Sequence, residues 1–175
     1  GDIEGQTFHF SEHVGKEAGL FLPPGTMGNV IGVKTHTRPA DAVIVEHMAP
    51  GHSEALADFF RRNDRHLAPW DPPRPAGITE PEFWMAECER AVEDHGHGTV
   101  VRWVLRLRAA PERVIGRINY TQIARGPFQS CMLGYAIDHA HEGRGLMREG
   151  LEATIGHVFA ALGLHRIQAN YVPHN

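Results

Sequence analysis

The sequence predicts a fold of the broad α/β class and, more narrowly, an α+β domain. The domain is built on one mixed sheet, which is mostly antiparallel and has a single parallel strand pair. Three strand-like runs, at residues 100–107, 114–123 and 130–138, follow one another with only short turns between them. This arrangement is typical of an antiparallel meander. A glycine-containing loop and a helical stretch then separate the third run from a last one at 165–172. A strand, helix and strand in that order predict a parallel, right-handed crossover, with helices covering the faces of the sheet.

The other elements follow from helical periodicity and capping signals. Ser53 is the predicted N-cap of a first helix whose apolar residues recur at helical spacing. Thr79 and Glu82 have the spacing of a capping box at the start of a second helix. Gly163 is placed to end the last helix. The sequence thus predicts a first strand at residues 42–48 and helices at residues 52–67, 79–93 and 146–161. We expect residues 1–40, rich in glycine and proline, to form an N-terminal extension of unassigned structure.

Composition excludes several classes of protein. Hydrophobic residues make up 42% and charged residues 22% of the 175-residue chain, as in ordinary globular domains. The formal charge of −4 gives no overall basic surface for nucleic acid. No apolar run approaches the ~20 residues that span a bilayer, so we expect no membrane contact. The two cysteines, Cys88 and Cys131, are predicted to be reduced in a cytoplasmic protein, with Cys131 a buried strand residue rather than a nucleophile.

The strongest chemical signal is the strand, Gly143-x-Gly145 loop and helix in succession. A helix N-terminus offers free N–H groups and a positive dipole end, and glycines let a phosphate approach the backbone. Arg144 and Arg148 add positive charge nearby. The P-loop pattern is absent, and Arg148 stands where a dinucleotide-binding fingerprint needs glycine. The loop alone leaves two alternatives open, a pyrophosphate site or a tight turn that binds nothing.

Residues 41–175 resemble the GNAT superfamily of acyl-CoA N-acyltransferases, and within it the ribosomal-protein-alanine N-acetyltransferase branch. The resemblance rests on five segments in a fixed order: LAPW (67–70), NYTQIARGPF (119–128), LGYAI (133–137), EGRGLM (142–147) and HRIQANYVPHN (165–175). It implies a GNAT fold in which the two parallel strands splay apart.

The resemblance also implies a co-substrate, acetyl-CoA, and the residues that bind it. The end of the third meander strand matches the part that pairs with the pantetheine amides, and the loop matches the pyrophosphate site. Asn175 matches an asparagine that faces the coenzyme. The implied coenzyme-binding residues are Ile137, Asp138, His139, Glu142, Gly143, Arg144, Gly145, Leu146, Met147 and Asn175. Glu142 and Met147 depart from the superfamily pattern, and a carboxylate near a pyrophosphate is unfavourable unless it points away or is paired.

Acetyl transfer requires a deprotonated amine, a donor for the developing oxyanion, and close positioning of both reactants. Asn170, Tyr135 and Asn119 are the candidate catalytic residues near the splayed strands. Asparagine is unusual in a strand, which favours a site role for Asn170, whereas tyrosines such as Tyr120 and Tyr135 more often pack with one hydrogen bond. No residue stands out as the general base. The histidine pairs of residues 95–97 and 139–141 lack further spaced ligands, so the sequence predicts no metal site.

We therefore expect transfer of an acetyl group from acetyl-CoA to an amine, first of all the N-terminal amine of a protein such as a ribosomal protein. A non-catalytic acyl-CoA-binding domain and a small-molecule N-acetyltransferase remain as alternatives. Loops at 64–80 and 121–129 are expected to select the acceptor. A GNAT domain normally continues beyond the strand at which this sequence stops, so we expect a C-terminally incomplete domain. A second chain, a homodimer or residues 1–40 would then cover the exposed sheet edge.

Overall fold

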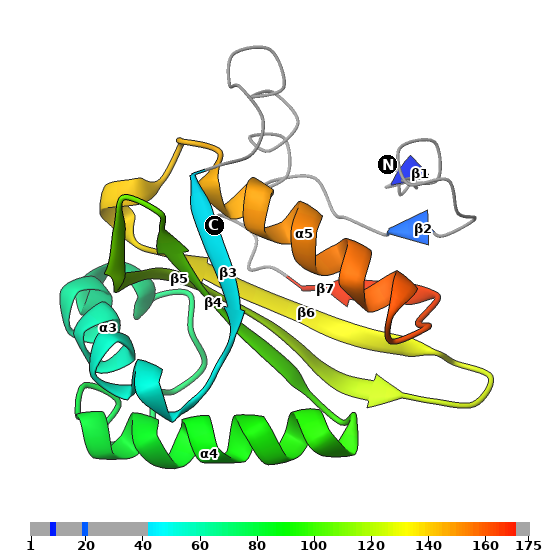
Figure 1. Ribbon diagram of the computed structural model, residues 1–175, viewed down its shortest axis with the longest axis horizontal. Helices are drawn as coiled ribbons and strands as arrows, with labels where there is room; N and C mark the ends of the chain where they lie inside the picture. The colour runs from blue at the N-terminus through cyan, green and yellow to red at the C-terminus, as the bar shows by residue number, and fades with distance from the viewer. Residues whose placement is uncertain (1–7, 10–18, 21–41, 171–175) are drawn as a thin grey trace, which may run out of the picture.

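The computed structural model describes residues 8–9, 19–20 and 42–170, and its main feature is a five-stranded sheet with helices on both faces (Figure 1). The sheet consists of β3 (Val43–His47), β4 (Val101–Leu107), β5 (Ala110–Ala124), β6 (Ser130–Ile137) and β7 (Arg166–Ala169). The helices are α3 (Ser53–Leu67), α4 (Pro81–His97) and α5 (Leu146–Ala160), with 3-10 turns η2 (Pro50–His52) and η3 (His139–His141). Two short strands, β1 (Phe8–His9) and β2 (Gly19–Leu20), pair with each other. The rest of the predicted N-terminal extension lies outside the described residues.

The strand order is β3-β4-β5-β6-β7, and each neighbouring pair from β3 to β6 is antiparallel. The last pair, β6 with β7, is parallel and is connected through α5. The predicted meander and parallel unit are therefore confirmed. Among the described residues, no helix is long and apolar enough to cross a membrane.

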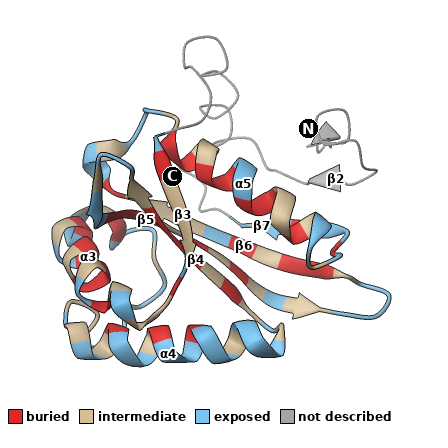
Figure 2. Ribbon diagram, in the orientation of Figure 1, coloured by how far each residue is buried: buried red, intermediate tan, exposed pale blue. Residues whose placement is uncertain are grey.

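Each face of the sheet has its own hydrophobic core, because its strands present alternate side chains to opposite faces (Figure 2). On one face, α5 packs Leu151, Ile155 and Val158 against the sheet. On the other face, α3 and α4 bury apolar residues that include Phe59 and Trp84.

The structure corrects three local predictions. Thr79 and Glu82 do not form a capping box, because α4 begins at Pro81 with Glu80 as N-cap. Proline suits this first helical position, where its missing N–H has no helical partner. The predicted N-cap Ser53 is instead the first residue of α3. Third, α4 extends beyond its predicted end at residue 93 to His97. Gly98 follows as the C-cap in a left-handed conformation, with φ of 67°.

Candidate active site

The loop between β6 and α5 has the backbone geometry of an anion site. Gly143 and Gly145 adopt left-handed conformations, with φ of 69° and 77°, which favour glycine. Gly145 is the N-cap of α5, and no side chain caps this helix end. The first helical bond runs from the N–H of Glu149 to the carbonyl of Gly145 at 3.1 Å. The N–H groups of residues 146–148 therefore have no acceptor within the helix.

The side chains of this loop divide between core and surface. Leu146 and Met147 are buried in the core under α5, so only their backbone groups face a ligand at the helix end. Arg144 is exposed. Burial lowers the pKa of His141, and the positive charges of Arg144, Arg113 and Arg62 lower it further. These effects indicate a positive electrostatic field around the loop, which suits a pyrophosphate.

Helix α3 holds the base of the loop in place. Asp138, which is only 3% exposed, forms an ion pair with Arg62 and accepts the N–H of Ala140 at 3.0 Å. The backbone N–H of Asp138 donates to Ile115 O at 2.7 Å. The backbone N–H of His139 donates to Asn63 Oδ1 at 2.9 Å. The amides of Asp138 and His139, which the resemblance assigns to pantetheine, thus have partners inside the protein.

The carboxylate of Glu142 is paired, as a position beside a pyrophosphate requires. One oxygen, Oε1, lies 2.7 Å from His66 Nε2, and the other, Oε2, lies 3.6 Å from His139 Nδ1. His66 belongs to α3 and His139 to η3. Of the two arrangements expected for this carboxylate, pointing away or being paired, the structure shows pairing, with histidines as the partners.

In the described part of the chain, β6 pairs with β7 from Ser130 opposite Arg166 to Leu133 opposite Ala169, and β6 itself continues to Ile137. The N–H of Asp138 points toward β5, so the backbone groups of Tyr135 and Ile137 point to the opposite edge, because hydrogen-bonding directions alternate along a strand. Within the described part of the chain, no strand pairs with this edge beyond Leu133. A peptide-like ligand can add to it as a further strand.

The three candidate catalytic residues do not share one face of the sheet. Tyr135 packs with the core under α5, and burial raises the pKa of its phenol. Asn119 instead lines a pocket on the α3–α4 face, opposite Gly134 of β6. A Cβ atom built on Gly134 would meet no atom within 4 Å, so the space beside Asn119 is open there. Asn170 follows β7 and is exposed, and Asn175 lies outside the described residues.

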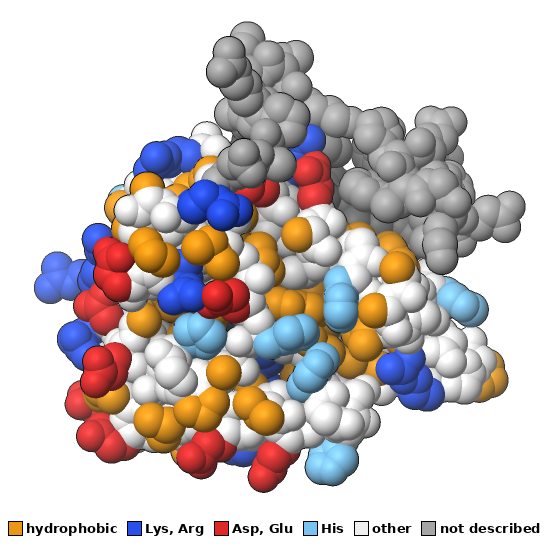
Figure 3. All heavy atoms as spheres, viewed as in Figure 1, with side chains coloured by type: hydrophobic (Ala, Val, Ile, Leu, Met, Phe, Trp, Pro, Cys, Tyr) orange, Lys and Arg blue, Asp and Glu red, His pale blue; other side chains and the backbone are white. Residues whose placement is uncertain are grey.

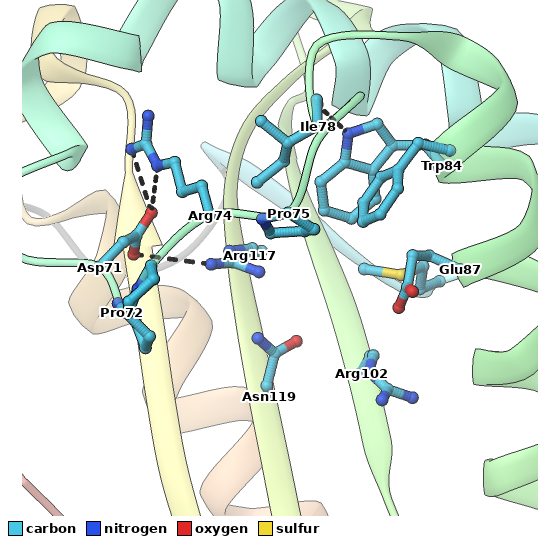
Figure 4. Close-up of a pocket in the computed structure, with 13 residues that line it drawn as sticks. Asp71, Pro72, Arg74, Pro75, Ile78, Trp84, Glu87, Arg102, Arg117 and Asn119 are labelled. Atoms are coloured by element: carbon cyan, nitrogen blue, oxygen red, sulfur yellow. Dashed lines mark hydrogen bonds and ion pairs between the residues drawn. The ribbon is translucent and has the colours of Figure 1, made fainter.

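The pocket beside Asn119 has a volume of about 260 Å³ and lies between α4, the α3–α4 connection and the strands β4 and β5 (Figure 4). Thirteen residues line it: Met48, Asp71, Pro72, Pro73, Arg74, Pro75, Ile78, Phe83, Trp84, Glu87, Arg102, Arg117 and Asn119. Several of them belong to the predicted acceptor-selecting loop at 64–80. Arg117 was not among the predicted site residues. Its position two residues before Asn119 is the sequence signal for it, because residues i and i+2 of a strand lie on one face.

Two polar atoms in this pocket are buried without a hydrogen-bond partner, Arg117 Nε and Asn119 Oδ1. Burial lowers the pKa of Arg117, while Asp71, with Oδ1 3.8 Å from the guanidinium, opposes this change. Asp71 also pairs with Arg74 at 3.1 Å. Buried polar groups normally have partners, so these two atoms point to a polar ligand.

Tyr120 and the two cysteines have structural roles. The side chain of Tyr120 is fully buried, and its hydroxyl lies 3.1 Å from Thr154 Oγ1, as expected for packing with one hydrogen bond. Burial raises the pKa of Cys88 and of Cys131 to about 11. A thiol with such a pKa is almost entirely protonated near neutral pH and is a poor nucleophile.

Comparisons with known proteins agree with this geometry. The family profile described as "Acetyltransferase (GNAT) domain" matches residues 43–175. The chain therefore belongs to the GNAT acetyltransferase family, and the predicted family and enzyme class, an N-acetyltransferase, are confirmed.

Two of the similar proteins are named as ribosomal-protein acetyltransferases. The chain is 34% identical over 151 residues to "[Ribosomal protein uS5]-alanine N-acetyltransferase" of Escherichia coli, covering 86% of this chain and 76% of that protein. The crystal structure of ribosomal-protein-S5-alanine acetyltransferase from Vibrio fischeri is 33% identical, with a TM-score of 0.74 over 80% of this chain and 76% of that one. Mycobacterium smegmatis RimJ in complex with CoA-disulfide, 24% identical, has the same fold, with a TM-score of 0.71 over 78% of this chain and 66% of its own.

Proposed function

We propose that this N-acetyltransferase transfers the acetyl group of acetyl-CoA to the N-terminal amine of a protein, with a ribosomal protein as the first candidate acceptor. The names of the Escherichia coli and Vibrio fischeri relatives support this acceptor class. The two buried, unpaired cysteines agree with a cytoplasmic location.

The donor site combines the loop with the open edge of β6. The N–H groups at the start of α5 and the exposed Arg144 receive the pyrophosphate. The backbone groups of Tyr135 and Ile137 receive the pantetheine amides as an added strand would. The thioester then lies on this edge of β6, near Gly134.

One observation carries the proposal: the proposed coenzyme edge of β6 adjoins the pocket. Leu133, which pairs with Ala169, is followed in β6 by Gly134, which lies opposite Asn119. The coenzyme edge and the acceptor pocket therefore meet across a residue without a side chain.

The pocket favours the reactive form of the acceptor. A free α-amine has a pKa of about 7.7–8.0. Arg74, Arg102 and Arg117 line the pocket together with the carboxylates of Asp71 and Glu87, so three positive charges face two negative ones. This excess of positive charge disfavours a bound ammonium. Asn119 Oδ1 accepts a hydrogen bond from that amine and orients its lone pair. The nitrogen attacks the thioester carbonyl, the C–S bond breaks, the thiolate leaves, and the amine proton passes to solvent.

A thiol-release assay tests the proposal. We expect turnover with a peptide that begins with alanine and little turnover with the same peptide after N-terminal blocking. Binding of desulfo-CoA by calorimetry without turnover on any acceptor would support the alternative, a non-catalytic coenzyme-binding domain. Turnover on small amines alone would identify a small-molecule acetyltransferase.

A further inference from the structure

Two histidines and one glutamate form a cluster beside the glycine loop. The nitrogen atoms of His66 and His139 and a carboxylate oxygen of Glu142 lie within 4.8 Å of one another. The imidazole rings of His66 and His139 are 4.7 Å apart between centroids. Among the described residues, this is the one group of three or more metal-ligating side chains with such spacing. The sequence did not reveal it, because its third member comes from α3.

The cluster rests on a fixed backbone. Residues 62, 63 and 66 recur at helical spacing on one side of α3. Arg62 pairs with Asp138, and Asn63 accepts the N–H of His139. Arg62 and Asn63 therefore fix η3 against α3. His66, one turn further along, then meets Glu142 and His139. These contacts fix the backbone that carries the three ligands, which favours binding of an ion.

The donor types match a borderline transition metal. Neutral imidazole nitrogen and carboxylate oxygen both coordinate Zn²⁺, and two histidines with one glutamate constitute a known ligand set for zinc sites that keep an open position. The carboxylate of Glu142 already divides its two oxygens between the histidines. An ion between the three groups would replace these weak contacts with direct bonds.

We propose that His66, His139 and Glu142 bind one divalent transition-metal ion of the Zn²⁺ type. The ion neutralises the carboxylate at the first position of the glycine loop, and it thereby strengthens binding of the coenzyme pyrophosphate. This second effect rests on the function proposed above, whereas the metal site itself does not.

Calorimetric titration of Zn²⁺ into untagged, chelator-treated protein tests the site, and Co²⁺ absorption reports its ligands. Loss of an outer-shell partner alone weakens metal binding by about 10–100-fold, so we expect H66A, H139A and E142Q to weaken it at least tenfold. H97A, which removes an exposed histidine at the end of α4, is the matched control and should bind as the wild type does. Equal Zn²⁺ affinity in the wild type and all three ligand variants would overturn the proposal.

Desulfo-CoA binding, measured with and without Zn²⁺, distinguishes failure of the metal-site proposal from failure of the proposed function. Desulfo-CoA should bind the wild type several-fold more tightly with Zn²⁺ than without it, and E142Q should remove this difference. If Zn²⁺ binds at these residues but desulfo-CoA binds in neither condition, the proposed function fails and the metal site stands. If desulfo-CoA affinity is the same with and without bound Zn²⁺, the coupling is refuted.

Discussion

Asn63 Oδ1 accepts a hydrogen bond from the backbone N–H of His139 at 2.9 Å, across 76 residues of sequence. Asn63 is 1% exposed, and its amide nitrogen also donates to Phe59 O at 2.9 Å. This side chain therefore connects α3 to the loop that we assign to the coenzyme pyrophosphate.

Asn63→Ala should weaken both the fold and the loop. A hydrogen bond of this kind contributes about 0.5–1.5 kcal/mol, and Asn63 makes two, so the free energy of unfolding should fall by about 1–3 kcal/mol and the KM for acetyl-CoA should rise. Chemical denaturation and steady-state kinetics measure the two effects. Arg61→Ala, at an exposed position of the same helix, should change stability by no more than about 0.5 kcal/mol. Equal effects of the two substitutions would contradict the role of Asn63.

Gly145→Glu should abolish tight coenzyme binding. The substitution forces a side chain into a left-handed conformation and places a negative charge at the N-terminus of α5. We expect the affinity for desulfo-CoA to fall at least tenfold, which corresponds to about 1.4 kcal/mol. Gly163→Glu has a similar φ, 64°, in open space beyond the other end of α5, and controls for backbone strain and charge. Unchanged affinity in Gly145→Glu would remove the loop from the binding site.

Gly150→Ala should destabilise the packing of α5 on the sheet. The added Cβ would lie 2.6 Å from Cδ2 of the buried Leu105 and 3.2 Å from Cδ1 of Ile118. Overpacking of this kind costs about 1–3 kcal/mol, measured as a loss of unfolding free energy. Gly156→Ala, in the same helix but with no atom within 4 Å of its Cβ, should instead stabilise the protein by about 0.4–1 kcal/mol.

Asn119→Ala should impair transfer but not coenzyme binding. We expect kcat/KM for the acceptor peptide to fall by about 10-fold or more, because one hydrogen bond to the reacting amine, worth about 0.5–1.5 kcal/mol, and its orientation are lost together. The affinity for desulfo-CoA should stay unchanged in calorimetry. A loss of coenzyme affinity with normal acceptor kinetics would assign Asn119 to the coenzyme site and not to the acceptor pocket.

Stability should fall as the solution becomes acidic, in part because of His47. Histidines gather on the face shown in Figure 3, and His47 lies 4.3 Å from His95 and 5.9 Å from His157 between ring centroids. Burial lowers the pKa of His47 below 6.5, and the two neighbouring histidines lower it further. As the pH falls below 6.5, the imidazole takes up a proton in the unfolded chain before it does so in the native chain. The native state is therefore favoured fully above pH 6.5, and the stability that His47 contributes is lost as the pH falls through its native pKa.

Thermal denaturation between pH 7.5 and pH 5 measures this dependence. Trp103, which stacks on His47 at 5.0 Å, also reports the environment by fluorescence. His47→Gln should reduce the pH dependence of the Tm, whereas His165→Gln, which lies outside this group of histidines, should not. An identical pH profile in wild type and His47→Gln would refute the role of this cluster.

The fold could largely be predicted from the sequence, because periodicity and turn residues are local signals. The meander, the crossover helix and the glycine loop at 143–145 before it all follow from neighbouring residues. The opposite orientation of Asn119 and Tyr135 could not be predicted, because it depends on the register that pairs Tyr135 with Ile118. The contacts of Arg62 and Asn63 with residues 138 and 139 likewise join segments that no local pattern connects.

A crystal structure of the protein with acetyl-CoA tests the central claim most directly. We predict that the pyrophosphate lies within hydrogen-bond distance of the N–H groups at residues 145–148 and that a pantetheine amide pairs with the backbone of Tyr135 or Ile137. A coenzyme bound elsewhere, or a glycine turn without phosphate density at saturating coenzyme, would contradict the claim.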